Sequence, residues 1–269
     1  TPARAKALNA AGSAAYLQGD FPAAQRFWED ALAIHRHLGN QRAMAGALNN
    51  LGLIAENRGD YPRGRTLYEE ALAINRDLGN RPWEAININN LGNIAWNERD
   101  YPAARDCYER ALAINRELGN RGAEAQNLNN LGSAARESGD DVTARAHYRE
   151  ALRIKRELGD RRGIAVTLGQ LGLVAASQGD LATSGKIISD ALLMRRELGD
   201  RQGIAMSLEE ASVLACAAGE PERACRLFAA ADGLRSDLAS PLAAGERTRS
   251  ERGLGAARAA MDQSAFESA

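Results

Sequence analysis

Three asparagine pairs recur in the sequence at intervals of 40 residues, and their side-chain amides are the groups best suited to binding chemistry: Asn49-Asn50, Asn89-Asn90 and Asn129-Asn130. Each amide carries one acceptor and two donors, which match the groups of an extended peptide backbone. Asparagine is a poor residue for a helix interior, because its side chain competes with the backbone for hydrogen bonds. Three such pairs within helical patterns therefore require an explanation.

Two interpretations of the pairs are open: the amides bind a peptide, or they bridge to a neighbouring helix and fix its position. We favour peptide binding for the first residue of each pair: Asn49, Asn89 and Asn129. Buried amides usually form hydrogen bonds within the protein. We therefore favour the bridge for the second residue of each pair: Asn50, Asn90 and Asn130.

Catalytic and metal-binding motifs are absent from the sequence. It contains no phosphate-binding Gly-Lys-Ser/Thr, no Cys-x-x-Cys and no Gly-x-Ser-x-Gly. His35 and His37 are two residues apart, a spacing that does not place them on one helical face. We expect a protein that is not an enzyme and has no cofactor and no metal site.

The asparagine pairs lie in a unit of 40 residues that repeats along the chain. Each unit contains an internal turn such as Gly59-Asp60 and ends with a second one such as Gly79-Asn80. Glycine can take the left-handed conformation that ends a helix, and Asp or Asn can cap the next helix. With apolar residues at helical spacing on both sides of the internal turn, each unit is predicted to be a helical hairpin.

A small and a large residue recur at fixed places in the two helices of each unit. The pairs are Gly12 and Trp28, Gly52 and Tyr68, Gly92 and Tyr108, Gly132 and Tyr148, Gly172 and Ile188, and Ser212 and Phe228. Such pairing predicts close helix crossings with interdigitated side chains. One hairpin alone cannot bury these faces, so neighbouring hairpins must cover them.

The pattern of Leu51, Gly52, Gly59-Asp60-Tyr61, Tyr68 and Ala71 resembles the tetratricopeptide repeat. The usual unit of that family has about 34 residues, and the unit here is longer. It is similar to the long-helix variety of Pins-type adaptors, kinesin light chains and the sensor arms of bacterial transcriptional regulators. The resemblance implies an all-α fold, a right-handed α-solenoid of helical hairpins that binds protein or peptide segments in a concave groove.

In the family the first helices line the concave side, and the resemblance therefore implies which residues face inward. For the second unit they are Gly46, Asn49, Leu53, Glu56 and Asn57. For the third they are Ile86, Asn89, Asn93, Trp96 and Asn97, and for the fourth Gln126, Asn129, Ser133, Arg136 and Glu137. Asn93, Trp96 and Asn97 join the paired asparagines as predicted peptide-binding residues, with Trp96 as an apolar anchor.

We expect six repeats within residues 1–240, at about 3–40, 41–80, 81–120, 121–160, 161–200 and 201–238. The period stops near Pro241, and residues 241–269 are predicted to form a capping helix and tail. The end of the sequence has a looser resemblance to the closing segment of bacterial regulators. The start at Thr1 suggests a domain cut from a longer protein.

The net charge of −1 predicts no general attraction to nucleic acid or to an anionic membrane. No apolar run approaches the length of a membrane span, and the three irregularly spaced cysteines do not suggest disulfides. A cytoplasmic location fits these features. Near the downstream end, Glu209-Glu210 replaces the asparagine pair, and these residues either form a solvated helix face, repel an acidic partner or bind a basic one.

The leading hypothesis is a non-enzymatic module that holds a peptide or protein segment in the concave groove. An alternative is the ligand-sensing C-terminal arm of a bacterial transcriptional regulator or of a nucleotide-switch signalling protein. A second alternative is a scaffold that self-associates through its ends or its groove.

Overall fold

The computed structural model describes residues 1–238 and Gly255, and these residues contain twelve α-helices and no β-strand. The all-α class predicted from the sequence is confirmed. The capping helix expected within residues 241–269 lies, apart from Gly255, outside the described residues. In the described part of the chain, no helix combines the length and the apolar character needed to cross a membrane.

The chain divides into two compact units, Thr1–Asn120 and Arg121–Ala269. The helices of unit 1 are α1 (Pro2–Leu17), α2 (Phe21–His37), α3 (Gln41–Asn57), α4 (Tyr61–Asp77), α5 (Arg81–Asn97) and α6 (Tyr101–Glu117). Those of unit 2 are α7 (Arg121–Glu137), α8 (Asp141–Glu157), α9 (Arg161–Ser177), α10 (Leu181–Glu197), α11 (Arg201–Ala217) and α12 (Pro221–Asp237). The sequence gives no sign of this division, because its period continues unchanged past Asn120.

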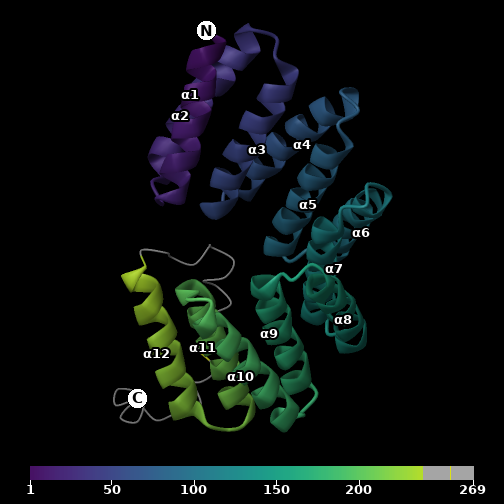
Figure 1. Ribbon diagram of the computed structural model, residues 1–269, viewed down its shortest axis with the longest axis vertical. Coiled ribbons are helices and arrows are strands. Elements are labelled where there is room, and N and C mark those ends of the chain that lie inside the picture. Colours follow the sequence, from purple (N-terminus) through teal and green to yellow (C-terminus); the bar gives the residue numbers. More distant parts are fainter. Residues whose placement is uncertain (239–254, 256–269) are drawn as a thin grey trace. The chain divides into compact units, whose positions relative to one another are not determined.

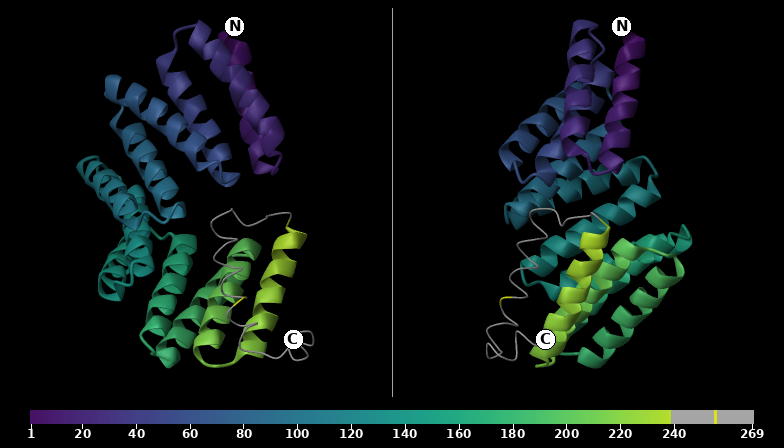
Figure 2. Two further views of the ribbon diagram at one scale, coloured as in Figure 1. Left: turned by 180° about the vertical axis from the view of Figure 1, so that it is seen from behind. Right: turned by 90° about the vertical axis from the view of Figure 1, so that its left-hand side faces the viewer.

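Each unit is a stack of three helical hairpins, the arrangement expected of an α-solenoid (Figure 1). Odd-numbered helices are the first helices of the hairpins and even-numbered helices are the second. In unit 1, α2 packs against α3 and α4 packs against α5, so each second helix also covers the next hairpin. The same contacts join α8 to α9 and α10 to α11 in unit 2. Figure 2 shows the hairpins from two further directions.

Turn chemistry sets the ends of these helices as the sequence predicts. Gly59 has a φ of 76°, and the side chain of Asp60 caps α4 by accepting a hydrogen bond from the backbone N–H of Arg63. Arg99 occupies the corresponding place in the third hairpin with a φ of 66°, a conformation that favours glycine. The hairpin therefore forms even where the glycine of its turn is missing.

The small-against-large crossings predicted from the sequence are confirmed for five hairpins. A Cβ atom added at Gly52 would lie 2.6 Å from a ring carbon of Tyr68, and one added at Gly92 would lie 2.7 Å from Tyr108. Gly12, Gly132 and Gly172 meet the large residue of their own hairpins in the same way. Only a residue without a side chain lets these two helices approach so closely.

Candidate functional site

A chain of amide hydrogen bonds joins the second and third hairpins of unit 1. Asn80 Nδ2 donates to Asn75 Oδ1 at 2.9 Å, and Asn75 Nδ2 donates to Asn87 Oδ1 at 2.9 Å. Asn87 Nδ2 then donates to Asn49 Oδ1 at 3.1 Å, and Asn90 Nδ2 donates to the same oxygen at 3.0 Å. Asn49 on α3 is thus the acceptor for two donors on α5, and the bonds hold the two hairpins in register.

The position of Asn49 differs from the exposed lining position expected for a peptide-binding residue. Its side chain is buried, with 9% of the residue exposed, because its oxygen forms the bridge between hairpins. The bridge favoured for Asn90 is present. Within the described residues, Asn49 Nδ2 donates to no partner, so the network fixes the amide with its donor end unused.

Asn129 in unit 2 is likewise buried, with 6% exposed, rather than placed on an open surface. Its Oδ1 lies 3.1 Å from the hydroxyl of Thr167 on α9, and Lys155 Nζ donates to that hydroxyl at 2.9 Å. Asn130 is half-buried, and its Oδ1 accepts a hydrogen bond from Gln126. The first asparagine of two of the three pairs therefore contributes to packing between hairpins.

The remaining predicted residues are half-buried on α3 and α5. Two of them, Asn50 and Asn97, have side-chain amides without a hydrogen-bond partner in the described part of the chain. Asn93 accepts a hydrogen bond from the Tyr108 hydroxyl at 3.0 Å, and its amide N–H groups are unused among the described residues. Asn89 Nδ2 lies 3.5 Å from the side-chain oxygen of its neighbour.

We use the term first-helix face for the surface of unit 1 formed by α1, α3 and α5. It carries Tyr16, Asn50, Glu56, Asn57, Asn89, Asn93, Trp96 and Asn97, all of them half-buried. Asn57 Nδ2 donates to the hydroxyl of Tyr16 at 3.0 Å, which joins α1 to α3, and Asn90 joins α5 to α3. Three neighbouring helices thus present amides, aromatic rings and one carboxyl group on a single surface.

Among the residues named for this face, Glu56 is the one that carries a carboxyl group. It accepts a hydrogen bond from the Tyr68 hydroxyl at 3.0 Å. Burial raises the pKa of Glu56 to about 7, although the Tyr68 hydrogen bond acts in the opposite direction. The sequence places Glu56 inward but gives no reason to single it out, because its environment is created by residues from other helices.

A set of buried polar residues, one on each second helix, is not predicted from the sequence. It consists of His35, Asn75, Asn115, Lys155, Arg195 and Arg235, each with at most 6% exposed. They recur every 40 residues, three places before the leucine at the end of each unit, and this periodicity is a signal that could have revealed them. Burial lowers the pKa of Lys155 to about 8.

Glu209 and Glu210 do not form a solvated surface, because both are paired inside unit 2. Arg195 Nη1 donates to Glu210 Oε2 at 3.0 Å, and both side chains are buried. Burial raises the pKa of Glu210 to about 7 even though Arg195 lowers it. Arg235 forms two hydrogen bonds to Glu209, at 2.8 and 3.0 Å. The interpretation of this pair as a solvated face is therefore wrong.

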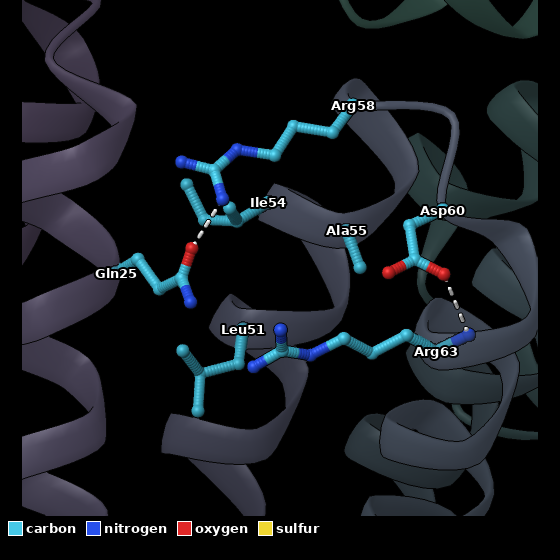
Figure 3. Close-up of a pocket in the computed structure, with 7 residues that line it drawn as sticks. All are labelled: Gln25, Leu51, Ile54, Ala55, Arg58, Asp60 and Arg63. Atoms are coloured by element: carbon cyan, nitrogen blue, oxygen red, sulfur yellow. Dashed lines mark hydrogen bonds between the residues drawn. The ribbon is translucent and has the colours of Figure 1, made fainter.

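A small cavity lies between α2, α3 and α4 (Figure 3). Its lining includes Gln25 and Arg58, which are hydrogen-bonded to each other, and Asp60, which caps the helix that carries Arg63. The volume of about 20 Å³ has room for one water molecule and none for a peptide side chain. No group of three or more His, Cys, Asp or Glu residues that could hold a metal ion occurs among the described residues.

Models of the tetratricopeptide repeat match residues 4–39, 43–117 and 85–157, which together cover more than half of the chain. No curated protein sequence matches it.

Solved structures with a similar fold include BtubC (BKLC) from P. vanneervenii. It is 22% identical, with a TM-score of 0.64 over 84% of this chain and 93% of that one. A Rap protein complexed with Competence and Sporulation Factor is 14% identical, with a TM-score of 0.68 over 92% and 74%. Aspartyl phosphate phosphatase F from Bacillus subtilis is 11% identical, with a TM-score of 0.74 over 95% and 69%. At these identities the similarity shows the fold alone.

Proposed function

Because the chain belongs to the tetratricopeptide repeat family, we propose that it is a non-enzymatic binding module that holds an extended peptide or protein segment on the first-helix face. The observation that carries this proposal is the pair of half-buried amides of Asn50 and Asn97, which have no partner among the described residues. A polar group that is half withdrawn from water and unpaired gains a hydrogen bond when a ligand supplies the missing partner.

The amide network prepares this surface for a peptide backbone. Asn49 Oδ1 is held by two donors, so its amide N–H groups are the end left for a carbonyl of the ligand. The Tyr108 hydroxyl fixes the oxygen of Asn93 in a similar way and leaves its N–H groups unused among the described residues. Side chains that are already oriented lose little entropy on binding, so the cost of ordering falls mainly on the peptide.

The other predicted residues complete the proposed surface. Asn89 and Trp96 lie seven residues apart on α5, a spacing that places them on the same side of the helix. Asn89 adds an amide, and Trp96 adds a large apolar surface of the kind that dominates binding energies. In unit 2 the corresponding residues, Asn129 and Asn130, stay predicted contacts of a ligand.

Selection from a random peptide library displayed on phage tests the proposal. We expect the purified chain to enrich binding peptides. The double variant Asn50→Ala and Asn97→Ala should lower their affinity by about tenfold, the value of two hydrogen bonds of about 0.7 kcal/mol each. Its melting temperature should not change, because neither amide has a partner in the described part of the protein.

Glu69→Gln supplies the matched control, because Glu69 is an exposed polar residue on the second helix α4. It should leave affinity unchanged. Failure to enrich any peptide, or an equal loss of affinity in the control, would contradict the proposal.

A second candidate function is ligand sensing within a larger bacterial signalling protein located in the cytoplasm. It is favoured by the shared fold of the Rap protein that is complexed with Competence and Sporulation Factor. The sequence that flanks this chain would test it, since a regulator should carry a DNA-binding or nucleotide-binding domain. Self-association is the remaining alternative, and light scattering over a range of concentrations would detect it.

A further inference from the structure

Glu56 lies at a repeated position near the end of the first helices where two aromatic residues flank it. Tyr16 on α1 and Trp96 on α5 occupy the same place in the 40-residue period, one hairpin before and one hairpin after. The hydrogen bond from Asn57 to the Tyr16 hydroxyl holds α1 beside this end of α3. In the order of the hairpins, Glu56 therefore comes between two aromatic residues at the same place in the repeat.

The carboxyl group of Glu56 has no cationic partner among the described residues. Its Oε2 accepts the hydrogen bond from Tyr68, and its Oε1 accepts none. Among the described residues, the groups whose pKa values the Glu56 charge raises are all tyrosines on neighbouring helices: Tyr16, Tyr61, Tyr68 and Tyr108. Burial without a compensating cation is costly for a carboxylate.

The other glutamates with comparable burial show that this protein normally pairs such groups. Every other described glutamate that is buried or half-buried forms an ion pair with an arginine: Glu70, Glu84, Glu124, Glu137, Glu150, Glu209 and Glu210. Glu84, which is in the same unit as Glu56, has two arginine partners, Arg76 and Arg81. Among the described glutamates that are buried or half-buried, only Glu56 therefore lacks a cation.

We propose that Glu56, flanked by Tyr16 and Trp96, is a subsite for a basic side chain of the peptide bound on the first-helix face. The proposal rests on the proposed function and adds a ligand preference to it. A lysine ammonium or an arginine guanidinium supplies the charge that Glu56 lacks, and aromatic faces attract the same cation through their quadrupoles. The ligand cation restores the pairing that other glutamates have within the protein.

Occupation of the subsite depends on pH. The cation binds the ionised carboxylate, whereas the pKa of about 7 leaves much of the carboxyl group protonated at mildly acidic pH in the free protein. Affinity for a basic peptide should therefore rise between about pH 6 and pH 8, a range given by the pKa of Glu56 and an interval of about one unit on either side. Tyr16, Tyr61, Tyr68 and Tyr108 all have raised pKa values and stay neutral over this range.

The test uses a peptide enriched from the random library and two analogues of it. In the first analogue norleucine replaces the lysine, or citrulline replaces the arginine, and in the second lysine and arginine are exchanged. Fluorescence anisotropy measures their affinity for the native chain and for Glu56→Gln, which keeps an acceptor for Tyr68. We expect the selected peptides to be rich in basic residues. Glu56→Gln should lower the affinity for the basic peptide by about tenfold. Affinity for the neutral analogue should change less than twofold.

Two controls separate a lost subsite from a lost fold. Glu98→Gln removes an exposed glutamate that pairs with Arg65, and it should affect both peptides equally. Tyr16→Leu removes one flanking ring without touching the carboxyl group, and it should weaken only the basic peptide. If Glu56→Gln melts below the assay temperature, the result for Tyr16→Leu decides.

The outcomes distinguish this inference from the proposed function. The subsite is overturned if the selected peptides show no preference for basic residues, or if Glu56→Gln lowers the affinity for a basic peptide and for its neutral analogue equally. Either result leaves the proposal of peptide binding intact. Failure to obtain any binding peptide overturns the proposed function and the subsite together. Comparing the lysine and arginine analogues shows which of the two cations the subsite prefers.

Discussion

At the scale of single residues, the burial of Glu56 bears both on the proposed binding of a ligand and on the stability of the fold. Its pKa in the folded protein is about 7, whereas its ordinary value is 4.5. The folded state therefore holds a proton that the unfolded state releases over this interval. Stability from this group is fully present below pH 4.5 and is lost as the pH rises to about 7. A binding residue that lowers stability at neutral pH is consistent with a carboxylate kept for a ligand.

Glu56→Gln should remove this pH dependence. A glutamine has no proton to lose, so the variant should gain stability relative to the native chain as the pH rises from 4.5 to 7. The expected gain is at most about 3.5 kcal/mol, from about 1.4 kcal/mol for each unit of pKa shift. Urea unfolding at both pH values measures it, with Glu69→Gln as an exposed control. Parallel pH profiles for Glu56→Gln and the native chain would show that Glu56 titrates normally.

Replacement of Asn87 and replacement of Asn97 should have very different effects on stability. Asn87→Ala deletes the two buried hydrogen bonds that link Asn75 and Asn49, and this loss should lower the free energy of unfolding by about 1–3 kcal/mol. Asn97→Ala deletes an amide that has no partner in the described residues, and it should change stability by less than about 0.5 kcal/mol. Thermal and urea unfolding of the two variants provide the comparison. Equal losses of stability would mean that the network does not join the hairpins.

At the scale of the helices, stability depends on how closely the two helices of a hairpin approach. Gly92 faces the ring of Tyr108, whereas Gly46 on α3 has open space where a Cβ atom would lie. Both glycines are inside helices with ordinary backbone angles. A glycine-to-alanine substitution at each of these two positions therefore separates the effect of the helix crossing on stability from the effect of helix propensity.

Gly92→Ala should destabilise unit 1 by about 1–3 kcal/mol, because the added Cβ atom would displace Tyr108. Gly46→Ala should stabilise it by up to about 1 kcal/mol, because alanine is the better helix former and meets no obstacle. Urea unfolding of both variants measures the difference. A stabilised Gly92→Ala would show that the crossing is looser than described.

The sequence predicts the helices well because their boundaries depend on local residues. Gly59 and Asp60 end one helix and begin the next through contacts within a few positions, and the crossing of Gly52 with Tyr68 lies within one hairpin. The burial of Asn49 depends instead on Asn87, which comes from the next hairpin and has no counterpart at Ala47. Such a bond cannot be read from periodicity.

The candidate site shows the same limit. The sequence identifies Asn50, Asn93, Trp96 and Asn97 as residues of one helical surface, and the structure places all of them half-buried on the first helices of unit 1. The sequence does not distinguish Glu56 from the many other acidic residues, because the absence of a cationic partner depends on the three-dimensional surroundings of the side chain. The sequence does not single out the buried polar residues of the second helices, exemplified by Arg195, because charged residues are usually exposed.

At the scale of the whole molecule, the two units carry different chemistry in the same repeat. In unit 1 the hairpins are joined by neutral amides, with Asn75 at the buried position of the second helix. In unit 2 that position is cationic, and Arg195 is paired with Glu210. Buried Arg195 and Arg235 of unit 2 pair with glutamates, and buried Lys155 donates a hydrogen bond to Thr167. Unit 1 instead leaves the half-buried amides of Asn50 and Asn97 without a partner, and the half-buried carboxyl group of Glu56 without a cation, among the described residues. This contrast favours unit 1 as the peptide-binding part.

Amide hydrogen exchange of the full chain, with and without a peptide enriched from the library, tests that claim most directly. We predict slower exchange in α3 and α5 when peptide is bound, with little change in α4, because the peptide should cover mainly the first helices of unit 1. The effect should be lost in the double variant Asn50→Ala and Asn97→Ala. Protection confined to unit 2, or to the second helices, would contradict the account.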